Sequence, residues 1–205
     1  MKKTILSLIL ILGFVNTDLQ AQDIRIGIHA SPNISMIRTN MDFDSRSSKL
    51  KFNWGVRAER KSIDRNFSYF AGIDLSSKGG KLEVDGIDFD INGKYIEIPM
   101  GIKMATRPIG EFSYWLNVGL VPNFKISEDV TLNSNVADPG ITDDYLSSLN
   151  ASLLLGLGIQ YELTEGTDLM GGIQFNNGFT NNIDNGSSDD KLSFNTLGLF
   201  IGVLF

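Results

Sequence analysis

The stretch Leu149–Tyr161 reads LNASLLLGLGIQY and alternates between two kinds of residue. Every odd position in it is apolar, whereas the even positions are mostly small or polar, with Leu154 as the exception. Successive side chains of a β-strand point to opposite faces, whereas a helix would distribute both sets around its circumference. The stretch therefore predicts a strand with one continuous apolar face.

The same period-two pattern recurs along the rest of the chain. It predicts about eight strands of about ten residues each, the length that a tilted membrane-spanning strand needs. The other predicted strands cover residues 24–31, 52–59, 67–76, 96–104, 114–120, 169–176 and 197–205. Short predicted connections alternate with long ones; the short ones are 61–66, 106–111 and 163–167, and the long ones are 38–50, 79–93, 127–147 and 180–192. This asymmetry is typical of an outer-membrane barrel, whose short turns face the periplasm and whose long loops face outside.

The composition of the non-apolar face favours a membrane barrel over a soluble sandwich. A soluble sandwich exposes Lys, Glu, Ser and Thr, whereas this face is rich in Gly with Asn, Gln and charges of both signs. Small side chains suit the narrow interior of a small barrel. Charged residues on this face should pair inside, because unpaired buried charges are costly. They are Arg25, Arg57, Glu59, Asp74, Glu97, Lys103 and Lys125, with Lys103 or Arg57 as the expected partner of Glu97.

Aromatic residues on the apolar face gather near its two ends. Those near the short turns are Tyr69, Tyr114, Tyr161 and Phe205, and those toward the long loops are Phe52, Trp54, Phe124 and Phe175. Two aromatic belts around an aliphatic band are typical of membrane-spanning barrels. The sequence therefore predicts an all-β, eight-stranded antiparallel up-and-down transmembrane β-barrel. A soluble sandwich or lipocalin-like barrel is the alternative fold.

Three segments resemble the small outer-membrane β-barrel family often labelled porin family or PorT-like. They are Ile26–Ser35 (IGIHASPNIS), Tyr95–Met100 (YIEIPM) and Gly198–Phe205 (GLFIGVLF). The resemblance spans nearly the whole chain after residue 21 and implies a fold rather than an activity. It also implies that the outer-membrane assembly machinery reads the C-terminal segment. Some relatives are linked to protein secretion or gliding, and nothing in this sequence selects that role.

The N-terminal segment predicts export, and with the barrel pattern this predicts location in the cell outer membrane. Lys2 and Lys3 precede an apolar run over residues 5–15, and a polar stretch then leads to Ala21. The run is too short for a spanning helix, which needs about 20 residues. Residues 1–21 are therefore predicted to be a signal peptide, and residues 22–205 the outer-membrane β-barrel domain.

Composition excludes several function classes. The chain has no Cys and one His, which excludes disulfide scaffolds, thiol catalysis and metal centres built from several Cys or His. Its net charge of −6 argues against nucleic acid as the main partner. His29 is the one conventional general base, and a lipid-modifying enzyme could combine it with Ser31 or Asp74. Because the period-two alternation places His29 on the inward face, we expect a hydrogen-bonded interior histidine rather than a catalytic one.

Residues 88–93 (DFDING) begin like a calcium-binding EF-hand loop. The twelfth position is Pro99 rather than Glu, and a strand follows, so we expect a tight Asn92-Gly93 turn in an acidic loop. No catalytic, cofactor-binding or metal-binding residue is predicted. Weak divalent-ion binding without a defined cage stays open for the loop carboxylates Asp85, Asp88, Asp143, Asp144, Asp189 and Asp190.

The predicted function is that of a non-enzymatic outer-membrane barrel with a side-chain-filled lumen and acidic external loops. Its role would be surface interaction or envelope structure. Expected contacts are outer-membrane lipid and the assembly machinery; the expected state is a monomer, and the ligand is unknown. Two alternatives stay open: an outer-membrane enzyme acting on lipids, and a soluble exported binding protein.

Overall fold

The structure is a computed structural model that describes residues 24–40, 45–62, 66–84, 87–133, 146–183 and 191–205. The predicted signal peptide, residues 1–21, lies outside the described residues. So do the loop carboxylates Asp85, Asp143, Asp144, Asp189 and Asp190.

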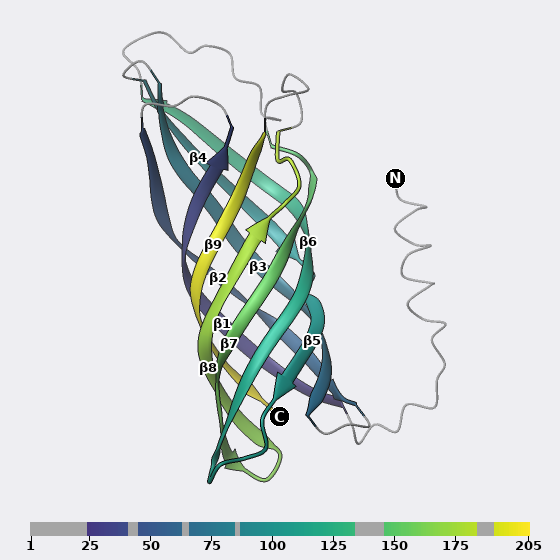
Figure 1. Ribbon diagram of the computed structural model, residues 1–205. Coiled ribbons are helices and arrows are strands. Elements are labelled where there is room, and N and C mark those ends of the chain that lie inside the picture. The colour runs from purple at the N-terminus through teal and green to yellow at the C-terminus, as the bar shows by residue number, and fades with distance from the viewer. Residues whose placement is uncertain (1–23, 41–44, 63–65, 85–86, 134–145, 184–190) are drawn as a thin grey trace, which may run out of the picture.

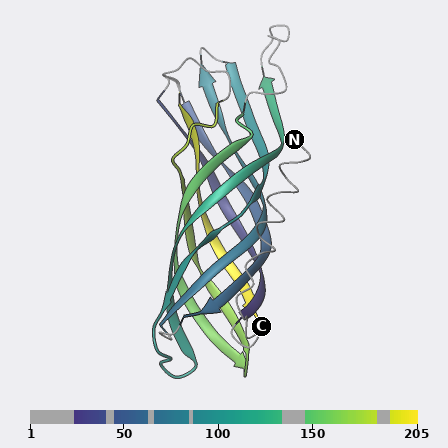
Figure 2. The same ribbon diagram turned by 90° about the vertical axis from the view of Figure 1, so that its right-hand side faces the viewer.

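The described residues form antiparallel strands that close into a ring (Figures 1 and 2). Strands adjacent in the chain pair with one another, except β4 and β5, which both pair with β3 and with β6. Because β1 also pairs with β9, the sheet closes on itself. Closure leaves no open sheet edge for lipid to face. The strands are β1 (Ile24–Thr39), β2 (Ser45–Lys61), β3 (Phe67–Val84), β4 (Ile87–Glu97), β5 (Met100–Ala105), β6 (Phe112–Asn133), β7 (Leu149–Thr164), β8 (Thr167–Gly178) and β9 (Leu192–Leu204).

The described part of the chain contains no helix that is long and apolar enough to cross a membrane.

The predicted strand 96–104 is divided in the structure between the end of β4 and β5. Pro99 lies at the break, because proline has no N–H for the ladder. The Ile98 N–H still donates to the Pro122 carbonyl at 2.9 Å, and the Pro99 carbonyl accepts from the Gly72 N–H at 2.8 Å. Both segments pair with β3 and with β6, and neither register changes across the break. They therefore act as one strand, and the ring is the predicted eight-stranded barrel.

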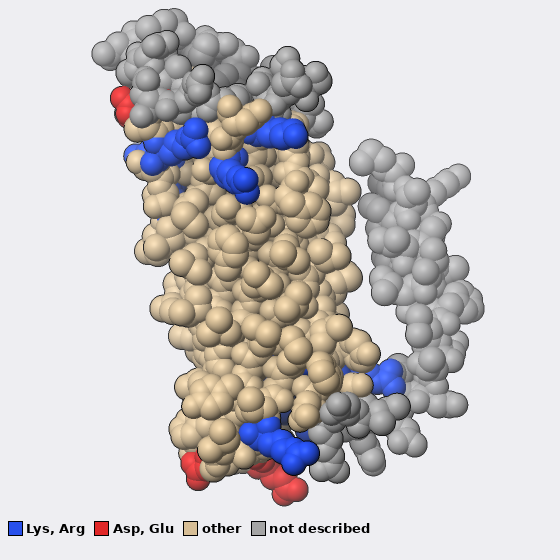
Figure 3. Space-filling view, viewed as in Figure 1, with Lys and Arg blue, Asp and Glu red and all other residues tan. Residues whose placement is uncertain are grey.

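The predicted faces of the strands are confirmed. On β7, Leu153, Leu155 and Leu157 are exposed, whereas Ser152 and Leu154 are buried. Figure 3 shows a band without charged residues on one face of the barrel, between charged side chains at its two ends. The exposed members of the predicted aromatic belts are Phe52, Trp54, Tyr69, Tyr114, Phe124 and Phe205, while Tyr161 and Phe175 are half-buried.

Such an outer wall suits hydrocarbon and would be a large exposed apolar patch in water. Large apolar side chains are exposed on every strand of the ring. The interior instead holds most of the buried polar and charged residues, which is the reverse of a soluble sandwich. The soluble alternative is therefore wrong.

The strands continue further at the long-loop end than the sequence predicts. Residues 79–93, predicted as a loop, lie mainly in the β3–β4 hairpin. The predicted Asn92-Gly93 turn is wrong, because Asn92 pairs with Gly79 within that hairpin. A hairpin that extends beyond the membrane has no lipid-facing side, so both of its faces can carry polar residues. Its composition then resembles that of a loop, which is why the strand pattern was missed here. The predicted connection 38–50 is likewise mostly strand, whereas the three short connections lie where predicted.

Candidate functional site

Ion pairs fill the lumen near the end of the barrel that carries the short turns, here called the short-turn end. Glu59 on β2 accepts a hydrogen bond from Lys103 on β5 at 2.8 Å and pairs with Arg57 Nε at 2.9 Å. Arg25 on β1 pairs with Asp168 on β8. These pairs offset the cost of removing the charges from water. The predicted inward pairing of Arg25, Arg57, Glu59 and Lys103 is confirmed.

Apolar side chains also close the lumen. Trp115 Nε1 donates to the Ile159 carbonyl at 3.0 Å, and the indole meets the Phe200 ring edge to face at 5.7 Å. Inward glycines leave room for the indole, since a Cβ at Gly158 or Gly172 would lie 2.6 Å from it. Two buried clusters result: the Trp115 cluster (Trp115, Met170, Phe200, Leu204) and a second one (Phe70, Val121, Leu154).

The interior, predicted to be rich in glycine and polar side chains, therefore also holds large aromatic residues. The period-two alternation does place Trp115 and Phe200 inward, but the many glycines on that face give the impression that the interior holds only small side chains. A glycine opposite a large aromatic residue makes room for it rather than leaving the interior open.

His29, Ser31 and Asp74, the candidate enzymatic group, line one enclosed space in the lumen. His29 Nε2 lies 3.2 Å from Asp74 Oδ2, and the imidazole packs against the Phe200 ring with the ring centres 5.1 Å apart. The free space beside them measures about 10 Å³, which is room for about one water molecule. A lipid acyl chain or head group does not fit there, so the geometry favours the expected interior histidine.

A second buried ion pair lies further toward the long-loop end. Lys78 Nζ on β3 is 2.7 Å from Glu97 Oε1 on β4, and both side chains are 2% exposed. The same ammonium donates to Asn123 Oδ1 at 3.1 Å. The predicted partners of Glu97 were Lys103 and Arg57, and that prediction is wrong, because both pair with the Glu59 carboxylate. Residue 78 lies beyond the predicted end of its strand and was therefore missed.

An apolar cluster closes the lumen at the long-loop end. Tyr95 and Phe194 meet edge to face within it, with ring centres 6.5 Å apart. Lys125 donates to the Leu146 carbonyl and pairs with Glu128 at 3.0 Å, so the predicted inward pairing of Lys125 is confirmed. The buried members of this Ile37 cluster are Ile37, Leu82, Ile91, Tyr95, Leu146, Ile183, Leu192 and Phe194.

The structure offers no metal cage within its described residues, where no three His, Asp or Glu gather. Asp88 and Asp90 belong to strand β4 rather than to a calcium loop. Burial raises the pKa of Asp90, but hydrogen bonds from Lys49 and Asn92 outweigh it and hold that pKa below its usual value. Asp90 is therefore already paired with a cation of the chain itself.

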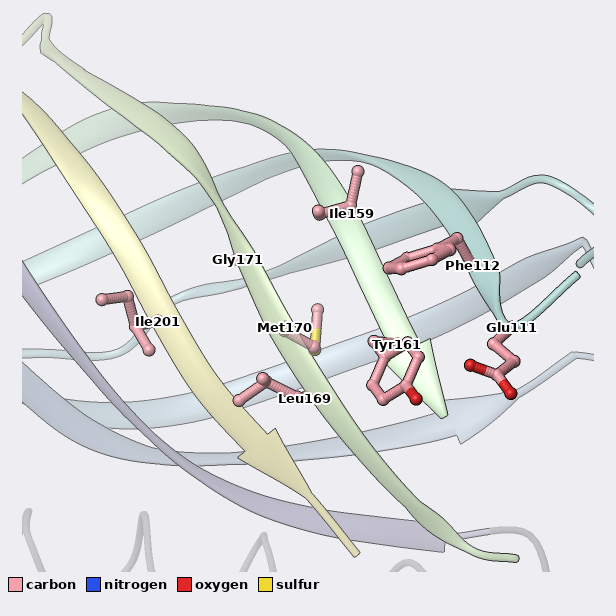
Figure 4. A pocket seen from close by; sticks show the side chains of 8 residues that line it. All are labelled: Glu111, Phe112, Ile159, Tyr161, Leu169, Met170, Gly171 and Ile201. Carbon is pink, nitrogen blue, oxygen red and sulfur yellow. The ribbon is translucent and has the colours of Figure 1, made fainter. Parts of the chain in front are cut away.

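Two clefts lie near the short-turn end. The lumen opens there in a mouth of about 580 Å³ whose lining includes Arg25, Glu59 and Lys103. A second cleft of about 510 Å³ lies in the outer wall across β6, β7, β8 and β9 (Figure 4). Glu111 lines both clefts. The outer one, here called the wall groove, is lined by Glu111, Phe112, Ile159, Tyr161, Leu169, Met170, Gly171 and Ile201.

Comparison with solved structures shows the fold. Neisserial surface protein A is 16% identical with a TM-score of 0.52, covering 87% of this chain and 95% of that one. OprG of Pseudomonas aeruginosa is 12% identical with a TM-score of 0.54, covering 89% and 97%. A major outer membrane protein of Thermus thermophilus is 14% identical with a TM-score of 0.53, covering 89% and 98%.

Comparison with protein families gives the affiliation. No curated protein matches this chain significantly. The profile of the family described as "Outer membrane protein beta-barrel domain" matches residues 20–184, which is most of the chain. With the closed ring and the apolar outer wall, this match places the protein in the cell outer membrane. The chain belongs to the outer membrane protein beta-barrel domain family.

Proposed function

We propose that this protein is a non-conducting, non-enzymatic barrel with a surface-interaction or envelope-structural role. The filled lumen is the observation that supports the proposal most. The Trp115 cluster, the Lys78–Glu97 pair and the Ile37 cluster occupy it at different levels. Eight strands enclose little more space than packed side chains need. "Porin" is then a family label and not an activity.

The enzymatic alternative has less support. His29 and Asp74 are paired, but the free space beside them holds about one water molecule, which is too small for a lipid substrate. Neither the barrel wall nor the mouth at the short-turn end offers a second histidine, since the chain has one. We therefore assign the His29–Asp74 pair to the packing of the lumen.

The interaction role is supported by the extension of the barrel at the long-loop end. Strand β6 continues for nine residues beyond the belt residue Phe124, up to Asn133. The β3–β4 hairpin extends equally far, because β4 pairs with β6 along this part. The Ile37 cluster gives this extension an apolar core of its own. Because long loops of such barrels face outside, the extension forms a firm base for an extracellular contact surface. A more specific version of this role is a contact with proteins of a secretion system, which the resemblance to the PorT-like family suggests.

The proposal also covers biogenesis and assembly state. Residues 1–21 are removed as a signal peptide, and the assembly machinery reads β9 with its final Phe205. The closed ring offers no free strand edge to a second copy, which favours a monomer in outer-membrane lipid.

Planar-bilayer recording tests the filled lumen. The full-length mature protein should insert without producing a large, steady conductance, because the clusters and ion pairs leave no open path. Heat-modifiable migration on a gel checks that the same preparation is folded, and a general porin serves as the positive control. A large, steady conductance from the folded protein would contradict the proposal.

A further inference from the structure

The wall groove exists because one outward side chain is missing. Gly171 faces outward on β8, where it pairs with Ile159 of β7 and Ile201 of β9. Leu169 and Ile173, the next outward residues on the same strand, are both exposed apolar side chains. A Cβ added at Gly171 would have no atom within 4 Å, which is true of no other glycine in the described strands. The other strand glycines instead lie against neighbouring atoms.

The groove is apolar along its length and has a carboxylate at one end (Figure 4). Glu111 supplies the carboxylate from the short turn before β6. The Tyr161 hydroxyl donates a hydrogen bond to it, and the Tyr161 ring lies 5.0 Å from the Phe112 ring. Tyr161 thereby holds the one charged group of the groove beside its aromatic end.

We propose that the wall groove binds one acyl chain of a phospholipid whose head group carries an amine. Its lining faces the hydrocarbon of the membrane, and the short-turn end places it in the periplasmic leaflet. The Glu111 carboxylate attracts an ammonium and repels a head group with only negative charge. Glu111 also borders the lumen mouth, so the head group would lie at the rim of the barrel.

The volume fits this occupant. Sites for small ligands measure about 300–1,000 Å³ and are mostly apolar with a few placed polar groups. The groove has 510 Å³, apolar residues from four strands and a single carboxylate. The hydrocarbon chain would pass over Gly171, and the head group would lie at Glu111. This site is independent of whether the lumen conducts.

Native mass spectrometry of the full barrel in detergent tests the proposal. Equal amounts of phosphatidylethanolamine and phosphatidylglycerol are offered, and bound lipid is counted. We expect one retained phosphatidylethanolamine, and a decrease in its binding of about tenfold in Gly171→Leu, whose side chain fills the groove. Ala71→Leu, which adds the same side chain at an exposed position on β3, should bind as the unmodified protein does. Unchanged binding in Gly171→Leu would overturn the groove as the site.

The Glu111→Gln variant tests the head group separately. It should bind both lipids equally, because the carboxylate that selects the amine is gone. Equal binding of both lipids by the unmodified protein would overturn the selection by Glu111. Folding is checked by urea unfolding, in which Gly171→Leu should be at least as stable as the parent, since glycine weakens a strand interior.

Discussion

Leu155→Arg should prevent stable insertion into the membrane, whereas Leu163→Arg, at the exposed short-turn end of the same strand, should be tolerated. Leu155 is exposed midway along β7, where it pairs with Val118 and Phe175. An arginine at the bilayer midplane costs roughly 2–4 kcal/mol, and the cost falls to about 0–1 kcal/mol near an interface. Leu163 lies beyond the belt residue Tyr161 and beside the short turn, where a guanidinium can reach water.

The two arginine variants are compared by membrane fractionation and by urea unfolding in lipid vesicles. Leu163→Arg controls for the added charge and for the changed side-chain shape. Equal losses of insertion in both variants would show that Leu155 does not face the membrane interior.

Glu97→Gln should destabilise the folded barrel by about 3–5 kcal/mol, because it leaves the Lys78 ammonium buried without a counter-charge. Both side chains of this pair are 2% exposed. One hydrogen bond to Asn123 stays available to the ammonium, but an amide oxygen does not neutralise a charge. Adding Lys78→Met to Glu97→Gln should restore much of the lost stability, since the lone charge is then removed as well.

The matched control for this experiment is Asp90→Asn in the Lys49–Asp90 pair. Those two side chains are 20% and 29% exposed, so water screens the pair and the loss should be at most about 1 kcal/mol. Free energies of unfolding from urea titrations in lipid vesicles give the comparison. An equally small effect of both single substitutions would mean that water enters the lumen at Lys78.

The outer wall of this barrel is predictable from the sequence, because apolar residues recur at every second position of each strand. Leu149–Tyr161 displays that period, and the structure places its apolar residues outside. The lumen is less predictable, because the partner of an inward charge can lie on the same strand, as for Arg57 and Glu59, or on a strand far away in the chain, as for Arg25 and Asp168. Lys78 could have been placed inward by extending the period past residue 76. The β3–β4 register sets it opposite Gly93 and sets Glu97 opposite Asp74, so the Lys78–Glu97 pair depends on how the side chains run inside the lumen.

The candidate sites show the same limit. Period two places Gly171 outward, so a missing side chain in the wall could have been noticed from the sequence. That Glu111 and Tyr161 close one end of the resulting groove depends on how a turn packs beside β7, which alternation does not describe. Conversely, the sequence singles out His29, Ser31 and Asp74, but only the structure shows how little space they share.

The most direct test of the outward apolar wall is spin labelling of β7. The chain has no cysteine, so Leu153→Cys, Leu155→Cys, Leu157→Cys and Leu163→Cys each give one labelling site. In lipid vesicles, labels at 153, 155 and 157 should collide with oxygen dissolved in the hydrocarbon and not with a water-soluble nickel complex. The label at 163 should meet the nickel complex. Labels at 155 and 157 that are shielded from oxygen, or open to nickel, would contradict an outer wall in contact with lipid.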